Sequence, residues 1–278
     1  MLCPSAPSER DGGTVHGSSL RAALIQLRVD PDEPVADRRE RAARMVREQS
    51  AADLVVLPEG WPVGAFSFDR FEDEAEPAAD GPTAAAMSAA ARDADVWLHA
   101  GSVVERAPGG ELFNTSLVFA PDGSLAATYR KIHRFGFDRG EATLMAAGTE
   151  TVTVDHPAAV IGLATCYDLR FPEQFRSLVD AGSRVFVVPA GWPRARAGHW
   201  SLLARARAVE NQAYVLACGT SGSHAGVPMA GRSAIIDPWG EVLAEAEDAE
   251  EQVLTATLDL AEVARIRDTF PALKDRVL

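Results

Sequence analysis

Cysteines are few in this sequence, and they lie far apart. Among 278 residues only Cys3, Cys166 and Cys218 are cysteines, and no C-x-x-C pair occurs. This pattern provides neither a disulfide framework nor a thiolate metal site. We therefore expect the protein to work in a reducing, cytoplasmic environment.

Long apolar runs and an excess of positive charge are also missing. No stretch approaches the roughly 18 apolar residues that a membrane span needs, and residues 1–19 lack the apolar segment of a secretory signal. The formal net charge is -13 and the pI is about 4.9. We expect neither a membrane partner nor a nucleic-acid partner, because a strongly acidic surface does not hold phosphates by general electrostatics.

The overall composition is that of an ordinary globular protein. Hydrophobic residues make up 47% of the chain and charged residues 24%, which is enough for a substantial buried core. No repeat of fixed period and no long linker divides the chain. We predict a flexible tail over residues 1–19 and a single domain over residues 20–278.

Apolar strands alternate with amphipathic helices along this domain. Two buried strands, LRAALIQLRV (20–29) and DLVVLPEG (53–60), flank a charged helix at residues 35–51. Turn residues predict hairpins at residues 121–123 and within residues 232–246. The alternation is typical of an α/β fold. Further strands are predicted at residues 96–105, 158–166, 184–193, 213–220 and 251–260, and further helices at residues 83–94, 172–180, 199–212 and 261–270.

Three chemically reactive side chains come directly after apolar strands. Glu59 follows DLVVLP, Lys131 follows SLAATYR, and Cys166 follows AAVIGLAT. The carboxyl ends of strands open onto the crevice where α/β sheets bind ligands, so these positions are candidates for a site. A carboxylate can take the proton of a thiol, and an ammonium ion can favour the thiolate and stabilise an oxyanion.

Each of the three residues also has a structural interpretation. Cysteine is among the most buried residue types, so Cys166 taken alone reads as a core thiol, as Cys218 does. Glu59 taken alone could cap a helix or a turn, and Lys131, in the basic run YRKIHR, could lie on a solvated face. Chemistry is favoured only when the three residues are considered together.

The motifs LPEG, YRKIHRF and CYDLRFPE, in this order, resemble those of the nitrilase superfamily of carbon-nitrogen hydrolases. The resemblance covers residues 20–278. It implies an αββα sandwich, in which two sheets pack face to face between layers of helices, and assembly into homodimers or larger oligomers. It implies no metal and no organic cofactor. Flanking segments that share the resemblance are FNTSLVFAPDG, GEATLMAAG, PAGWP, ARAVENQAYV and IIDPWGEVL.

The same resemblance implies roles for individual residues. Cys166 is the implied nucleophile, Glu59 the general base, and Lys131 the cation that stabilises the oxyanion. Glu141 matches a second glutamate that helps to orient the site in this family, and the backbone N–H of Tyr167 is the implied second oxyanion donor. The implied reaction is hydrolysis of an amide through a thioester, with release of ammonia or an amine.

The residues after the cysteine indicate a branch of the family. CYDLRFPE resembles the omega-amidase and deaminated-glutathione amidase branch, whereas true nitrilases usually have Trp-Glu after the cysteine. We therefore expect a small linear amide as the substrate. The segment KIHRFGFDRGE, between the lysine and the second glutamate, is shorter than in omega-amidases, so the acid-terminated substrates of that branch are not carried over with the resemblance.

Aromatic residues near these motifs are candidates for the wall of a small pocket. They are Trp61, Phe66, Phe135 and Trp192, and each could equally belong to the core. Trp192 is the strongest candidate, because PAGWP lies just after an apolar strand.

Arginines are the residues that would bind a substrate carboxylate, since their guanidinium groups bind carboxylates bidentately. Arg170 is a candidate for substrate binding, although its neighbours Asp168 and Glu173 also suggest a structural ion pair. Four other arginines are available, namely Arg134, Arg139, Arg194 and Arg196.

Three alternative functions stay open. The same fold and residues could hydrolyse an N-carbamoyl compound or a nitrile. The chain could also be a catalytically idle binding protein. A Cys-His hydrolase would instead use His133 or His199 as its base, although neither lies in a recognisable partner motif.

Overall fold

The computed structural model describes residues 19–247 and 250–277. The tail predicted over residues 1–19 lies outside the described residues, except for Ser19, with which the first strand begins. The extent of a single domain over residues 20–278 stays a prediction.

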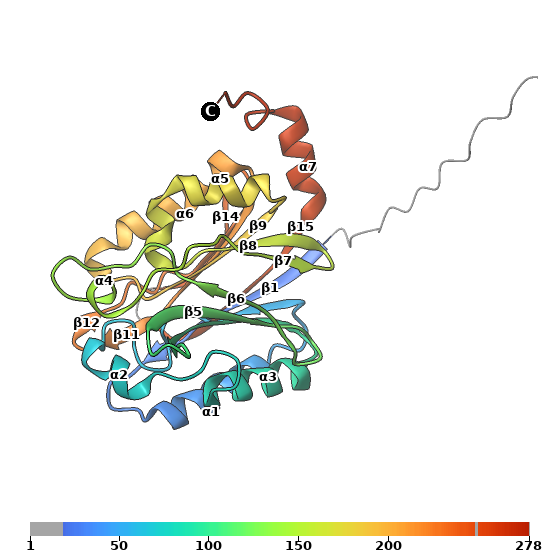
Figure 1. Ribbon diagram of the computed structural model, residues 1–278. Helices are drawn as coiled ribbons and strands as arrows, with labels where there is room; N and C mark the ends of the chain where they lie inside the picture. The colour runs from blue at the N-terminus through green and yellow to red at the C-terminus, as the bar shows by residue number, and fades with distance from the viewer. Residues whose placement is uncertain (1–18, 248–249, 278) are drawn as a thin grey trace, which may run out of the picture.

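Two six-stranded sheets form the centre of the protein (Figure 1). The strands of the first sheet are β1 (Ser19–Gln26), β3 (Leu54–Val56), β4 (Trp97–Arg106), β5 (Leu112–Phe119), β6 (Leu125–Arg130) and β15 (Gln252–Asp259). Those of the second are β7 (Thr153–His156), β8 (Ala159–Leu163), β9 (Val185–Ala190), β10 (Tyr214–Gly219), β13 (Ala234–Ile236) and β14 (Val242–Glu245). The strand orders are β15-β1-β3-β4-β5-β6 and β14-β13-β10-β9-β8-β7.

Helices cover the outer face of each sheet (Figure 1). The first sheet carries α1 (Val35–Arg47) and α3 (Pro82–Ala94), and the second carries α5 (Pro172–Asp180) and α6 (Ala197–Asn211). The αββα sandwich expected from the sequence is therefore confirmed. The helix α7 (Leu260–Thr269) lies at the C-terminal end of the sequence. Shorter elements are η1 (Phe68–Arg70), α2 (Phe71–Glu74), α4 (Glu141–Leu144), η2 (Cys166–Arg170) and η3 (Arg194–Arg196).

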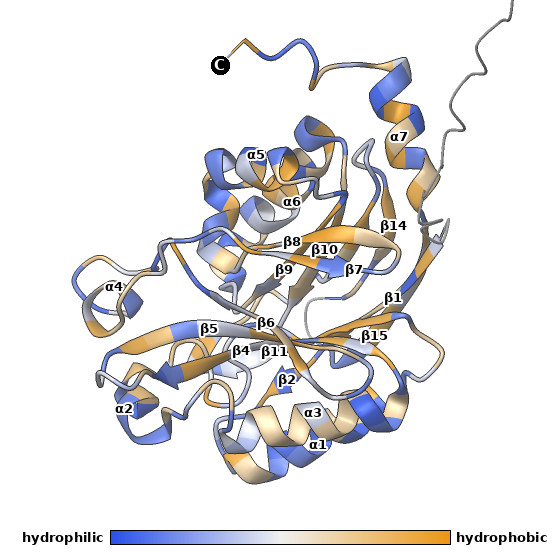
Figure 2. Cartoon of the chain, turned by 45° about the vertical axis from the view of Figure 1, so that its right-hand side comes forward, coloured by the Kyte–Doolittle hydropathy of each residue, from blue (hydrophilic) through white to orange (hydrophobic). Residues whose placement is uncertain are grey.

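Strand β1 shows why its sequence is apolar throughout. Leu20, Ala22 and Leu24 pack between the two sheets, whereas Ala23 and Ile25 pack beneath α1 and α3. Successive residues of a strand point to opposite faces, so a strand that is covered on both faces needs an unbroken apolar run. Figure 2 shows such runs along the central strands and polar residues on the outer faces of the helices.

Both predicted hairpins are present, and the larger predicted strands and helices are confirmed. Gly123, with φ of +84°, occupies the turn that joins β5 to β6, and the second hairpin joins β13 to β14. The sequence did not indicate three short strands, because each has few residues and no clear alternation. They are β7, β11 (Ser221–His224) and β12 (Val227–Pro228). β2 (Arg28–Val29), which joins β11 and β12 in a small sheet, is the end of the predicted strand at residues 20–29.

The topology places several strand ends on one edge of the sandwich. β1, β3 and β4 are parallel, as are β8, β9 and β10. The carboxyl ends of both parallel sets therefore lie where ligands bind in α/β folds.

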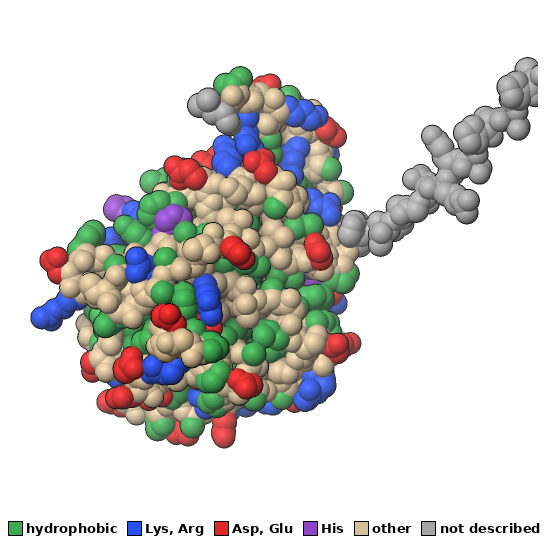
Figure 3. Space-filling view, viewed as in Figure 1, with side chains coloured by type: hydrophobic (Ala, Val, Ile, Leu, Met, Phe, Trp, Pro, Cys, Tyr) green, Lys and Arg blue, Asp and Glu red, His purple; other side chains and the backbone are tan. Residues whose placement is uncertain are grey.

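The surface carries both signs of charge. Acidic and basic side chains are interspersed on the face seen in Figure 3. None of the helices in the described part of the chain has both the length and the apolar character that a bilayer requires.

Candidate active site

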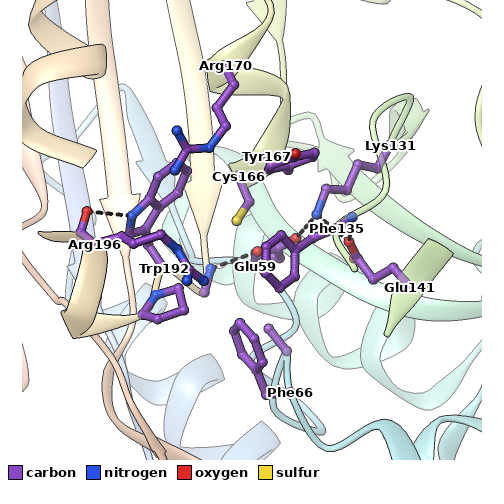
Figure 4. A pocket seen from close by; sticks show the side chains of 13 residues that line it. Glu59, Phe66, Lys131, Phe135, Glu141, Cys166, Tyr167, Arg170, Trp192 and Arg196 are labelled. Atoms are coloured by element: carbon purple, nitrogen blue, oxygen red, sulfur yellow. Dashed lines mark hydrogen bonds and ion pairs between the residues drawn. The ribbon is translucent and has the colours of Figure 1, made fainter. Parts of the chain in front are cut away.

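A pocket of about 380 Å³, its open mouth included, lies at these carboxyl ends (Figure 4). This volume suits a small molecule. The residues to which the sequence assigned a catalytic role, and most of those proposed to bind substrate, line this pocket. They are Glu59, Lys131, Phe135, Glu141, Cys166, Tyr167, Arg170 and Trp192.

Cys166 is the first residue of η2, at the sharp turn that follows β8. Its φ is +49°, in the left-handed region that side chains other than glycine rarely adopt. The chain changes direction sharply here, and the sulfur faces the pocket. Cys166 is otherwise buried, with an exposed fraction of 8% for the whole residue. The backbone N–H of Thr165 donates to the Asp168 carboxylate at 2.8 Å, which holds the start of the turn.

Four buried side chains form a closed ring of hydrogen bonds beside the sulfur, and Figure 4 shows three of them, Glu59, Lys131 and Glu141. Lys131 Nζ lies 2.7 Å from Glu59 Oε1 and 2.7 Å from Glu141 Oε2. Asn114 Nδ2 donates to Glu59 Oε1 at 2.8 Å and also donates to Glu141 Oε1. An ammonium group has three N–H bonds, so two hold the carboxylates and the third is left for a ligand.

Backbone groups orient both carboxylates. Gly191 N–H donates to Glu59 Oε2 at 2.8 Å, and Phe135 N–H donates to Glu141 Oε2 at 2.8 Å. Gly191 also has no room for a side chain, because a Cβ there would lie 2.5 Å from the Ala65 Cβ. The strand end after β9 is therefore packed directly against the carboxylate of Glu59.

The thiol of Cys166 is protonated in the resting site. Burial raises its pKa well above the usual 9.0, the negative charge of Glu59 raises it further, and Lys131 opposes both effects. The nearby ammonium of Lys131 favours the thiolate, as expected, but desolvation and the Glu59 carboxylate outweigh its effect on the thiol pKa. Attack by sulfur therefore needs a base to take the proton at that moment.

The ammonium of Lys131 stays charged although it is buried. Burial lowers its pKa, but the charges of Glu141 and Glu59 outweigh burial and hold the pKa well above 10.5. Burial raises the pKa of Glu141 above 4.5, and Lys131 acts in the opposite direction. The site thus offers a permanent cation next to a protonated thiol and a carboxylate.

Aromatic rings wall the pocket. Phe135 meets Phe66 and Tyr167 edge to face, with ring centroids 5.8 and 5.4 Å apart. On the opposite side, the Trp192 ring is held by its Nε1, which donates to the Arg196 carbonyl at 2.9 Å. These rings limit the width of a ligand that reaches Cys166.

Two arginines lie on these rings at the pocket. The Arg170 guanidinium is 5.0 Å from the centroid of Trp192, and the Arg196 guanidinium is 5.2 Å from that of Phe135. Arg170 Nη2 is also 3.3 Å from His199 Nδ1. Within residues 19–247 and 250–277, neither arginine forms an ion pair with a carboxylate.

The comparisons with known proteins identify the family. Residues 21–268 match the carbon-nitrogen hydrolase family. The chain belongs to the carbon-nitrogen hydrolase family. It is a hydrolase of carbon–nitrogen bonds other than peptide bonds, with an amidase function.

Named relatives of this carbon-nitrogen hydrolase are amidases. A 2-oxoglutaramate amidase of Paenarthrobacter nicotinovorans is 43% identical over 264 residues, which cover 92% of this chain and 89% of the relative. Omega-amidase NIT2 of Homo sapiens is 34% identical over 271 residues, with 93% and 95% coverage.

Solved structures agree on the fold. A CN-hydrolase superfamily protein of Xanthomonas campestris, with an arsenic adduct in its active site, is 35% identical and superposes with a TM-score of 0.86, over 94% of this chain and 98% of that one. Nit3 of Saccharomyces cerevisiae, a member of the nitrilase superfamily, gives 0.84 at 30% identity, over 95% and 98%.

Some pocket candidates of this carbon-nitrogen hydrolase lie elsewhere. Trp61 is fully buried beneath the first sheet and donates to the Ala100 carbonyl at 2.9 Å, so it is a core residue. Phe66 does line the pocket. Arg134 donates to the carbonyls of Ala142 and Met145, which gives it a structural role. Arg139 and Arg194 are not among the residues that line this pocket.

The structural ion pair expected for Arg170 is absent from the described residues. Asp168 is fully buried and binds Tyr129, Thr165 and His133 instead. Neither His133 nor His199 lines the pocket beside Cys166, so the geometry does not favour a histidine as the base.

Sequence reasoning missed Asn114 and Gly191 as parts of the site, whereas Arg196, one of the available arginines, does line the pocket. Asn114 lies in the segment FNTSLVF on β5. The alternation of this strand indicates which residues share a face with Asn114, but it does not indicate a role in the site. One signal was available for Asn114. It is a polar residue on an inward face, and it lies in a segment that shares the family resemblance. Among the described residues, no cluster of three or more His, Cys, Asp or Glu is arranged to hold a metal ion.

Proposed function

We propose that this carbon-nitrogen hydrolase releases ammonia from a short linear amide that carries a carboxylate at its other end. One observation carries the proposal: the Cys166 thiol lies beside the Glu59–Lys131 pair in the same pocket that Arg170 and Arg196 line. The first three groups match the chemistry of amide hydrolysis, and the two guanidinium groups match an anionic substrate end.

The first half of the proposed reaction forms a thioester. Glu59 takes the proton of Cys166 while the sulfur attacks the amide carbon. The free N–H of Lys131 and the backbone N–H of Tyr167 donate to the oxyanion. Glu59 then returns the proton to the leaving nitrogen, the carbon–nitrogen bond breaks, and ammonia departs. Glu141 and Asn114 keep Lys131 and Glu59 in place.

The second half restores the enzyme. Glu59 takes a proton from water as the water oxygen attacks the thioester carbon. The carbon–sulfur bond breaks, the sulfur regains its proton from Glu59, and the product leaves as a carboxylic acid, which gives its remaining proton to solvent. Because the thiol is protonated at rest, one residue must remove a proton in each half, and Glu59 is the carboxylate beside the sulfur.

We propose 2-oxoglutaramate as the leading substrate. Relatives in Paenarthrobacter nicotinovorans and Bacillus subtilis carry the name 2-oxoglutaramate amidase. This molecule has an amide at one end of a short chain and a 2-oxo acid at the other. With the amide at Cys166, its carboxylate would meet Arg170 or Arg196, whose charges have no carboxylate partner among the described residues.

An ammonia-release assay tests the proposal. We expect turnover of 2-oxoglutaramate and of monoamides of other short dicarboxylic acids, and much slower turnover of N-carbamoyl amino acids and nitriles. Intact-mass spectrometry should detect an acyl adduct on Cys166, and the adduct should be absent from Cys166→Ala. Wild-type ammonia release by Cys166→Ala would contradict the mechanism, and preference for a carbamoyl compound or a nitrile would contradict the substrate.

Glu59→Gln separates the carboxylate mechanism from a histidine mechanism. We expect this variant to lose acylation of Cys166, since an amide cannot accept the thiol proton. Acylation at the wild-type rate in Glu59→Gln would contradict Glu59 as the base.

We also propose that the enzyme forms a homodimer or a larger homo-oligomer. Leu202 and Val209, seven residues apart on one side of α6, are 67% and 49% exposed. Trp239 and Phe270 are also exposed and contact each other, with ring centroids 6.0 Å apart. A second copy of the chain would cover this apolar area. A cytoplasmic location stays a prediction that rests on the sparse cysteines.

A further inference from the structure

Asp168 is a fully buried carboxylate that the proposed reaction does not use. Its Oδ2 accepts hydrogen bonds from the Tyr129 hydroxyl at 2.6 Å and from the backbone N–H of Thr165 at 2.8 Å. Its Oδ1 accepts from the backbone N–H of His133 at 2.9 Å and lies 2.8 Å from His133 Nδ1. Four donors therefore meet the roughly four accepting positions of one carboxylate.

These contacts join the two segments that carry the reacting groups. Tyr129 and His133 each lie two residues from Lys131, one on either side. Thr165 directly precedes Cys166, and Asp168 follows Cys166 in the same turn. One carboxylate thus ties the chain around Lys131 to the turn that presents the thiol.

The backbone of Lys131 is held from other directions as well. Its N–H donates to the Asn114 carbonyl at 2.9 Å, and its carbonyl accepts from Gly148 N–H at 2.9 Å. These bonds fix Lys131 relative to β5 and to the segment after α4. Asp168 links the lysine segment directly to the cysteine turn across the two sheets. Gln174 Nε2 adds a bridge from the Tyr129 hydroxyl to the Leu163 carbonyl, at the end of β8.

An apolar side chain would fill the position of Asp168 at a lower free-energy cost than a buried carboxylate. Burial of a charge away from water is unfavourable unless hydrogen bonds compensate for it. Within the described chain no lysine or arginine pairs with Asp168, and its ion-pair neighbour is His133. The arrangement is suited to hold several donors at defined positions rather than to fill space.

We propose that Asp168 is a positioning residue, which sets the placement of the Cys166 sulfur relative to the Lys131 ammonium. It acts through Thr165, Tyr129 and His133 and does not touch the substrate. The proposal rests on the proposed function in one respect, namely that Cys166 and Lys131 act on the same amide carbonyl of the substrate.

Asp168→Asn is the direct test. The new NH₂ group faces backbone N–H donors and loses at least one of these bonds, so the turn moves relative to Lys131. A misplacement near 1 Å lowers a rate by about 100-fold. We expect kcat for ammonia release to fall about 100-fold, with KM changed by less than about threefold, because the loss affects the transition state rather than substrate binding.

Alkylation of Cys166 by iodoacetamide, followed by mass spectrometry of the peptide that contains Cys166, tests the same placement without a substrate. The peptide separates Cys166 from Cys3 and Cys218. We expect a fall of about tenfold in the alkylation rate of Asp168→Asn. If the wild-type protein releases no ammonia from acid-terminated amides, the proposed function fails, while the alkylation rates still decide the role of Asp168. Val263→Ala, in the buried face of α7, is the control for a general loss of stability and should keep the wild-type kcat and alkylation rate.

Substitution of His133 gives a second test that does not depend on Asp168→Asn folding. His133→Ala removes one donor to Asp168, and we expect kcat to fall about tenfold. His133→Asn keeps a side-chain N–H near the place of Nδ1, and we expect most of kcat to return. Wild-type kcat and alkylation in a folded Asp168→Asn, or wild-type kcat in His133→Ala, would overturn the proposal.

Discussion

Asn114 shows how one neutral side chain can stabilise two buried carboxylates. Glu59 and Glu141 bring two carboxylates to one lysine, so the ring carries more negative than positive charge. The amide of Asn114 donates one N–H to each carboxylate without adding a charge. It thereby keeps the carboxylates apart while Lys131 retains an N–H for the pocket.

We predict that Asn114→Ala weakens both catalysis and stability. The substitution leaves two buried carboxylates with one donor fewer each, which costs about 1–3 kcal/mol of unfolding free energy and displaces Glu59. We expect kcat to fall about 10- to 100-fold, as measured by ammonia release. The matched control is Asn211→Ala, because Asn211 is also buried and donates to a carbonyl on α6. Equal kcat in the two variants would contradict the role of Asn114.

The second prediction for single residues concerns Arg170 and Arg196. If they bind the carboxylate of the substrate, Arg170→Gln or Arg196→Gln removes a charged hydrogen bond of about 1.5–3 kcal/mol. We expect kcat/KM for 2-oxoglutaramate to fall about 10- to 100-fold, mainly through KM.

Two controls accompany the arginine variants. An uncharged short amide should lose little in either variant, and Arg139→Gln, outside the pocket, should behave as the wild type. An equal loss for charged and uncharged amides would show that the arginines shape the pocket without binding a carboxylate.

At the level of elements, the ends of four strands assemble the site. Glu59 follows β3, Lys131 follows β6, Cys166 follows β8 after a short connection, and Gly191 follows β9. The sequence predicted the first three of these strand ends, because buried strands are recognisable as apolar runs. It did not predict that the segment around Lys131 would be tied through Asp168 to the turn that begins at Cys166, since that contact joins different sheets.

Helix α6 is the element on which the oligomer depends in our proposal. Leu202→Glu places a charge in the exposed apolar area, and we expect the variant to be smaller in solution than the wild type, as measured by light scattering coupled to size-exclusion chromatography. A control, Arg194→Glu, changes charge outside that area and should leave the mass unchanged. A wild-type mass for Leu202→Glu, or a monomeric wild type, would contradict an interface at α6.

Across the whole molecule, two buried histidines link folding to pH. Burial lowers the pKa of His99 to about 4 and that of His224 to about 3. In the unfolded chain both would titrate near the ordinary value of 6.5. Below that value the unfolded chain binds protons that the folded chain does not, so stability is present above pH 6.5 and is lost as the pH falls.

We predict a loss of roughly 2 kcal/mol of unfolding free energy for each of these histidines between pH 7.5 and pH 5. Urea unfolding at the two pH values measures it. In His224→Asn the side-chain oxygen can still accept from Ala65 N–H, as His224 Nδ1 does, but the group does not titrate. We expect the pH-dependent loss to shrink by roughly 2 kcal/mol in this variant, and an unchanged loss would contradict the assignment.

Local patterns in the sequence determined the α/β class, the αββα sandwich by way of the family resemblance, and the residues nominated for the site. Apolar runs and helical periodicity are local properties, so they predict strands, helices and the reactive side chains at strand ends. The same patterns could not separate Trp61 from Phe66, because both are aromatic residues after one strand and differ in which layer they meet.

The tertiary structure alone decided the electrostatics of the site. The protonated thiol of Cys166, the charged state of buried Lys131 and the donors from Asn114 and Gly191 depend on groups brought from β3, β5, β6 and β9. It also decided that Arg170 lies on an aromatic ring at the pocket, and that Asp168 binds the lysine segment rather than Arg170. Desolvation and the electrostatic effect of nearby charges depend on distances in the folded protein. The distance between segments of different sheets cannot be read from the sequence of either segment.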